Sequence, residues 1–144
     1  QYASTALAGE FIGILSGPDP ETVRSGLEAA AAYLEEASFR TANDAGDVVY
    51  FAHCISRTGA YLSRQAGAAA GTPMAYLIAP PAEALVGLDA AMKAAAVELR
   101  VFYGPPSETN FAGGLLTGDQ AACRAACEAF AQAVCEVAQK PLGG

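Results

Sequence analysis

The chain has 144 residues, which is enough for one complete small domain and part of a second. Its composition is 53% hydrophobic and 16% charged with a net charge of −7, so it lacks the basic footprint of a nucleic-acid-binding protein or of a polybasic membrane anchor. No uncharged apolar run reaches the roughly 18 residues that a membrane-spanning helix needs, and we therefore expect the excess apolar surface to lie in contacts between subunits.

The first predicted elements are a strand over residues 10–17 and a helix after the Pro-Asp-Pro-Glu turn at residues 18–21. The turn supplies a possible cap and places acidic groups near the positive end of the helix dipole. Apolar residues recur along this helix at steps of four, three and four, which indicates a single apolar face that lies on a sheet. They are Val23, Leu27, Ala30 and Leu34.

A second strand is predicted over residues 47–56, DVVYFAHCIS. The sequence AYLSRQAGAAAGT follows between Gly59 and Pro73 and is rich in alanine and glycine without clear periodicity. This composition predicts a long mobile loop.

The rest of the chain predicts a compact α+β module in the order strand, helix, strand, strand, helix. The strands are residues 74–80, 97–103 and 111–118, and the last two form a hairpin with GPPSETN at its tip. A helix over residues 81–96 carries an apolar stripe of Leu85, Leu88, Met92 and Ala95. The last helix follows Thr117-Gly118-Asp119 and is expected to bury Cys123, Cys127, Phe130, Val134 and Val137.

The first strand and helix repeat the last strand and helix of this module about a hundred residues earlier. Leu15-Ser16-Gly17 matches Leu116-Thr117-Gly118, Val23-Arg24 matches Cys123-Arg124, and Glu28-Ala29 matches Glu128-Ala129. Such self-similarity indicates a duplicated module. We therefore expect residues 1–36 to be the C-terminal part of a first copy whose beginning is missing, and residues 37–144 to be a second copy. The opening QYASTALAGEF has no signal-peptide pattern and is typical of a fragment.

Candidate metal and catalytic residues are few. Cys123 and Cys127 lie one helical turn apart and could bind a metal, but Phe130 on the same face favours core packing. His53 and Cys54 are strand neighbours that point to opposite faces, which favours a structural role for His53. The cysteines are not spaced as in a disulfide framework, which favours a reducing, cytosolic setting. A single histidine, with no nucleophile elbow, HExxH or Gly-rich phosphate loop, predicts neither an enzyme nor a cofactor.

The run from Met74 to Leu142 resembles the C-terminal domain of the EutL family, the tandem-domain shell proteins of the ethanolamine-utilisation bacterial microcompartment. PPSETN and TGDQAACRAACEAF are its most specific stretches, and NDAGDVVYFAHCISRTGAYLS and GEFIGILSGPDPETVRSGLEAA are also similar to matching segments of the family. The resemblance covers essentially the whole chain. The chain departs from the family in length, because a stretch expected at the N-terminus, which would complete the first domain, is absent.

This resemblance implies circularly permuted microcompartment domains in tandem and a homotrimer that forms a flat pseudohexameric tile. Such tiles pack with other shell proteins into a microcompartment shell in the cytoplasm, and a gated central pore and smaller pores pass small metabolites such as ethanolamine. The Ala/Gly-rich segment, with Gly67 and Gly71 on either side of three alanines, is then expected to be a gating loop at the central pore. The alternative is a soluble oligomeric sensor that binds a small cationic metabolite, with no lateral assembly.

Ethanolamine binding needs a carboxylate, an aromatic face for the ammonium group and a hydrogen-bonding partner. The resemblance favours Glu10 and Phe39 for the first two roles. Glu108, Thr109 and Asn110 at the hairpin tip could line the facing side. The alternative is that these polar residues belong to solvated loops and that Phe39 is a core residue. No metal ligands are predicted.

Overall fold

The computed structural model describes residues 2–3, 11–12, 14–36, 39–105, 107 and 109–140. The chain divides into two compact units, Gln1–Ser38 and Phe39–Gly144, and each is described by itself. Within the described residues, no helix combines the length and the apolar character required to cross a membrane.

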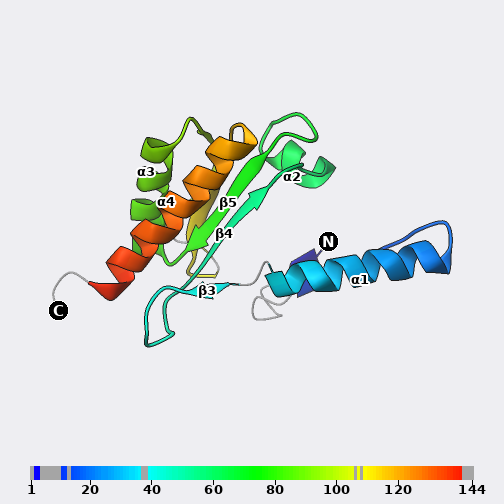
Figure 1. The fold of residues 1–144 in the computed structure, drawn as a ribbon, viewed down its shortest axis with the longest axis horizontal. Coiled ribbons are helices and arrows are strands. Elements are labelled where there is room, and N and C mark those ends of the chain that lie inside the picture. The colour runs from blue at the N-terminus through cyan, green and yellow to red at the C-terminus, as the bar shows by residue number, and fades with distance from the viewer. Residues whose placement is uncertain are drawn as a thin grey trace. The chain divides into compact units, whose positions relative to one another are not determined.

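A five-stranded antiparallel sheet forms the centre of the second unit (Figure 1). Its strands are β3 (Arg40–Thr41), β4 (Val49–Ile55), β5 (Met74–Ala79), β6 (Glu98–Tyr103) and β7 (Ala112–Thr117). They lie in the order β3-β4-β5-β7-β6. The four longer strands and the β6–β7 hairpin confirm the predictions, and a register shift between Leu99 and Val101 interrupts that hairpin.

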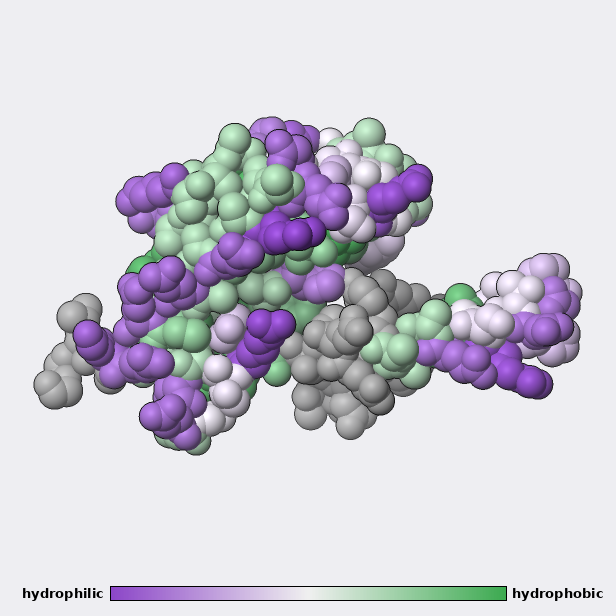
Figure 2. Space-filling view, in the orientation of Figure 1, coloured by the Kyte–Doolittle hydropathy of each residue, from purple (hydrophilic) through white to green (hydrophobic). Residues whose placement is uncertain are grey.

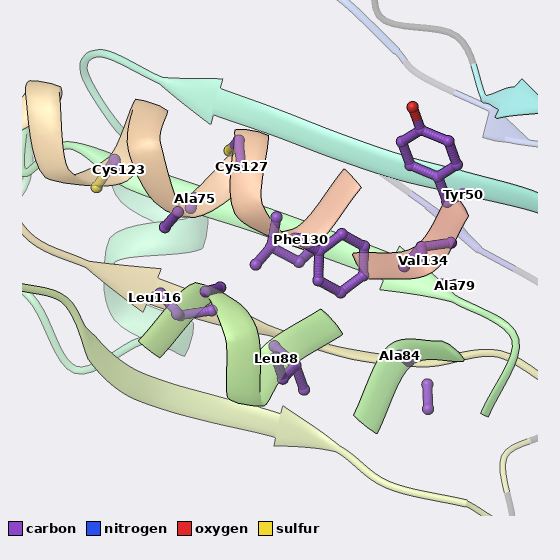
Figure 3. Packing of buried hydrophobic residues seen from close by; sticks show 14 of the residues in the cluster. Tyr50, Ala75, Ala79, Ala84, Leu88, Leu116, Cys123, Cys127, Phe130 and Val134 are labelled. Atoms are coloured by element: carbon purple, nitrogen blue, oxygen red, sulfur yellow. The ribbon is translucent and has the colours of Figure 1, made fainter. Parts of the chain in front are cut away.

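Helices α3 (Pro81–Ala94) and α4 (Gln120–Gln139) cover one face of the sheet. Pro81 at the first helical position of α3 loses no hydrogen bond there. The first turn of α4 is capped by Asp119, whose Oδ1 accepts a 2.7 Å hydrogen bond from the backbone N–H of Ala122. The α4 face buries Cys123, Cys127, Phe130 and Val134 as predicted (Figure 3). Val137 is only half-buried.

The predicted apolar stripe of α3 is wrong for Leu85 and Met92, which are exposed. Leu88 is buried, and Ala95, at the end of the helix, packs against the same core. The buried positions of α3 are Ala84, Gly87, Leu88 and Ala91. Small residues face the core because α3 approaches α4 closely. A Cβ on Gly87 would lie 2.7 Å from the ring of Phe130, so only a residue without a side chain fits at this crossing.

The segment predicted as a loop contains a short helix, α2 (Ala60–Gln65). Its Leu62 and the adjacent Ala66 pack with Met74 and Leu115 on the sheet face opposite α3 and α4. A six-residue helix is too short to show periodicity, which is why the sequence pattern missed it. Residues 66–72 of the predicted loop have no helix or strand, in agreement with the prediction.

The first unit contains β1 (Tyr2–Ala3), β2 (Phe11–Ile12) and α1 (Pro20–Glu36). The helix was predicted correctly, and Asp19 caps it with a 2.8 Å hydrogen bond from the backbone N–H of Thr22. The strand predicted over residues 10–17 is wrong for residues 14–17, which have no regular structure. The apolar face of α1 is not covered within the described residues, since Leu27 is 53% exposed.

Candidate functional site

An aromatic cluster lies on the sheet face opposite α3 and α4. Alternation along β4 places Tyr50 towards the helices and Phe51 on the other face. The ring of Phe39 lies 5.7 Å from the ring of Phe51 and 5.7 Å from that of Phe111, measured between centroids. Three segments distant in sequence therefore meet in one tilted aromatic group, in which Phe39 remains 51% exposed.

The cluster continues along the sheet through His53 and Tyr76, which face each other across β4 and β5. Phe51 makes an edge-on contact with Tyr76 at 5.7 Å and a tilted contact with His53 at 5.8 Å. Burial lowers the pKa of His53, because the protonated imidazolium is poorly solvated there. The histidine is therefore disposed to remain neutral at physiological pH.

Tyrosines extend the same face towards α2. Burial raises the pKa of Tyr103 to about 12, and the neighbouring Tyr76 and Tyr61 add to this shift because each phenolate disfavours the others. Burial, followed by the nearby Tyr61, also raises the pKa of Tyr76. Tyr76 and Tyr103 therefore act as neutral hydrogen-bonding groups at physiological pH.

The described part of this cluster can offer aromatic faces and neutral polar groups to a ligand. A small organic cation can lie over the exposed ring of Phe39, since the ring face is negative. A carboxylate would strengthen such binding. The two predicted carboxylates, Glu10 and Glu108, lie outside the described residues.

The remaining predicted site residues lie beside the cluster. Thr109 and Asn110 are exposed at the β6–β7 hairpin tip, directly before Phe111. Asn110 adopts a left-handed backbone with φ 56°, a conformation that asparagine tolerates better than most residues. The Ser107 hydroxyl donates to the Phe111 carbonyl and closes the turn. The chain thus brings Phe39 next to this hairpin, while Phe51 and Tyr76 were missed because their pairing depends on strand register.

The predicted gating segment is attached at both ends. At the base of the segment, the Thr58 hydroxyl donates to the Thr72 carbonyl at 2.9 Å. The same hydroxyl lies 2.7 Å from the Ser63 hydroxyl, with which it forms a hydrogen bond. Farther along, Arg100 on β6 donates to the carbonyls of Ala66 and Gly67 at 2.9 and 2.7 Å. We call this contact the Arg100 clasp. Gly67 and Gly71 have φ values of 59° and 85°, which other residues rarely adopt.

The cysteines of α4 belong to the core, as predicted. Cys123 is fully buried and Cys127 is 8% exposed. Burial raises the pKa of the two thiols to about 11 and about 12, so neither is a ready thiolate ligand or nucleophile at neutral pH. Within the part of the chain that the structure describes, no three His, Cys, Asp or Glu side chains are grouped closely enough to hold a metal ion.

Comparison with known proteins gives a consistent result. No protein-family model matches the chain. The bacterial microcompartment shell protein EutL of Clostridium perfringens (strain 13 / Type A) is 58% identical over 142 residues, which cover 98% of this chain and 65% of that protein. The chain therefore spans less than two thirds of its relative.

Solved structures agree with this similarity. The monoclinic crystal structure of EutL from Clostridium perfringens matches with a TM-score of 0.85 and 58% identity, over 98% of this chain and 64% of that one. The trimeric bacterial microcompartment shell protein PduB, at 24% identity and a TM-score of 0.71 over 85% of this chain and 55% of its own, shares the fold. The predicted α+β microcompartment fold is thus confirmed. By sequence and by fold, the chain belongs to the EutL family of bacterial microcompartment shell proteins.

Proposed function

We propose that this chain is part of a structural shell protein of an ethanolamine-utilisation microcompartment, located in the cytoplasm. The observation that carries the proposal is the 58% identity to a EutL shell protein over 98% of the chain. In this role three chains form a pseudohexameric tile, which packs with other shell proteins and has no catalytic function. Electron microscopy of the purified protein tests it. Extended sheets or stacked tiles are expected, whereas discrete trimers with tight metabolite affinity would instead favour the sensor.

The proposal includes a tandem architecture, with residues 1–36 as part of a first, circularly permuted domain and residues 37–144 as the second. Two capped helix starts support it, because Asp19 and Asp119 lie 100 residues apart and each accepts a hydrogen bond from the backbone N–H three residues later. Light scattering tests the trimer, and a stable monomer at micromolar concentration would contradict it.

The proposed ligand is ethanolamine, bound weakly near Phe39. A molecule with four heavy atoms reaches only about 6 kcal/mol at a ceiling of roughly 1.5 kcal/mol per atom, and a pore must also release it. Glu10→Gln is expected to reduce the binding free energy by about 1–3 kcal/mol if the carboxylate pairs with the ammonium group in a partly buried site.

Calorimetric titration with ethanolamine tests this site. Phe39→Ala is expected to weaken binding, whereas Phe102→Ala is the matched control, because its ring is 50% exposed compared with 51% for Phe39. Equal affinity of the wild-type protein and Glu10→Gln would remove Glu10 from the site, and equal effects of the two phenylalanine variants would remove Phe39.

The proposed gate is the segment around Gly67 and Gly71, with the Arg100 clasp as its closed attachment. Replacing Arg100 by alanine removes the hydrogen bonds to Ala66 and Gly67, so amide exchange in this segment is expected to become about tenfold faster. Arg64→Ala is the control, since the Arg64 side chain donates to the Ala60 carbonyl within its own helix. Wild-type exchange as slow as that of β5 would contradict a gate.

A further inference from the structure

The two repeated helices differ at the six positions that are buried in α4 but share an exposed Arg and an exposed Glu. Six positions are buried in α4, and none has the same residue in α1. In contrast, Arg24 and Glu28 of α1 recur as Arg124 and Glu128 of α4. The six α4 positions and their α1 counterparts are Cys123/Val23, Ala126/Gly26, Cys127/Leu27, Phe130/Ala30, Ala133/Tyr33 and Val134/Leu34.

The recurring Arg and Glu, which we call the Arg–Glu stripe, are exposed in both helices. Four residues separate them, so they lie one turn apart on the same helix face. Within the described residues, the ion pairs are Lys93–Asp89 and Arg100–Glu98, so neither stripe forms an ion pair within its own helix. The order Arg before Glu is also the less favourable one for an isolated helix. Helix stability therefore gives little reason for the stripe to occur twice.

The surface beside the α4 stripe suits another helix. Ala121 and Ala125, together with Gln120, Arg124 and Glu128, line a shallow, largely open surface region of α4. Figure 2 shows hydrophilic side chains along the diagonal of α4, beside an apolar area over α3 and α4. Small side chains with charges at their margins allow two helices to approach closely and to form ion pairs at the edge of the contact.

We propose that the Arg–Glu stripe is a contact surface for a second copy of this chain, where it meets another Arg–Glu stripe in antiparallel orientation. The stripe is self-complementary, because antiparallel pairing sets each Arg opposite the partner's Glu and each Glu opposite the partner's Arg. The chain carries a positive and a negative side chain one turn apart on both α1 and α4. A second copy of the chain therefore offers two matching stripes. This inference rests on the proposed shell assembly and identifies one of its contacts.

Two charge-reversed variants test the pairing. The first carries Arg24→Glu with Arg124→Glu, and the second carries Glu28→Arg with Glu128→Arg. Each has stripes of one sign, so self-association measured by sedimentation velocity is expected to weaken at least about tenfold. An equal mixture of the two restores pairing between unlike stripes and is expected to recover association to near the wild-type level. Arg57→Glu with Lys140→Glu changes the net charge as much as the first variant and is the control.

The outcomes separate the alternatives. Recovery in the mixture supports the inference, because a fold defect cannot be repaired by a second defective protein. If both variants unfold at a lower temperature, and only a chain that carries all four charge changes regains the stability, the stripe has a role confined to helix stability. That result would overturn the inference. Unchanged association of both variants would overturn the inference and leave the proposed function intact. Absence of association in the wild-type protein would overturn both.

Discussion

Helices α1 and α4 begin alike but differ in their surroundings. Asp19 and Asp119 accept hydrogen bonds of 2.8 and 2.7 Å from the backbone N–H groups of Thr22 and Ala122. After this shared start, α4 buries Phe130 completely against the sheet and α3, whereas Leu27 of α1 is half exposed. Local capping therefore determines where both helices begin, but within the described residues α4 alone of the two packs against a buried core.

The largest expected effect comes from the buried face of α4. Phe130→Ala is expected to lower the free energy of unfolding by about 3–5 kcal/mol, because the ring is fully buried and leaves a cavity. At the equivalent α1 position, Ala30→Ser is expected to cost less than about 0.5 kcal/mol on an exposed face. Urea denaturation monitored by circular dichroism measures both. Similar losses would mean that α1 is packed as tightly as α4.

Alanine substitutions at two glycines are expected to change the free energy of unfolding by intermediate amounts, in opposite directions. Gly87→Ala is expected to cost about 1–3 kcal/mol, since its Cβ would lie 2.7 Å from the ring of Phe130. Gly26→Ala puts a Cβ 2.5 Å from the end of the half-exposed Leu15 side chain, which can move away. That change is expected to stabilise α1 by up to about 1 kcal/mol through helix propensity.

Thermal unfolding of the two glycine variants measures this contrast. Combining Gly87→Ala with Phe130→Leu is the control for overpacking, because the smaller side chain relieves the contact. A Gly87→Ala protein as stable as the wild type would contradict the close crossing of α3 and α4.

Removing the aspartate caps is expected to have a smaller effect on stability. It tests whether α1 and α4 begin by the same capping interaction. Asp19→Ala and Asp119→Ala are each expected to destabilise their helix by about 1 kcal/mol. Loss of the α4 cap should lower the unfolding midpoint of the second unit, whereas loss of the α1 cap should change only the amide exchange of the first turn of α1. Asp→Asn at each position is the control, because asparagine also caps. A large change in the midpoint for Asp19→Ala would contradict the comparison.

The smallest effect is the response of α1 to acid. Hydrogen bonds from the backbone and side chain of Thr22 lower the pKa of Asp19 below its ordinary 3.8. A lowered pKa contributes stability that is present above the unfolded value and is lost as pH falls through the folded value. The Thr22 amide signal should therefore shift below about pH 4, and Asp19→Asn should abolish that response. An unchanged titration in the variant would assign it to another carboxylate.

Sequence periodicity and capping predicted the second unit well where the cause is local. The four longer strands have bounded apolar runs, and α4 has both a capping aspartate and an apolar stripe. Prediction failed at α2, where stability depends on contacts such as the hydrogen bond from Arg100, 34 residues away from Ala66. It also failed at the face of α3, because periodicity favours large apolar residues and the close contact with Phe130 selects Gly87.

The candidate site divides in the same way. The sequence by itself determined the family and the recurrence of Arg24 and Glu28 as Arg124 and Glu128, since these depend on residue identity and order. Only the tertiary structure decided that Phe51 and Phe111 join Phe39, because strand register and the hairpin bring together residues from separate segments. It also decided which copy of the repeated helix has a buried face, since burial depends on the surfaces that surround a helix and not on its own periodicity.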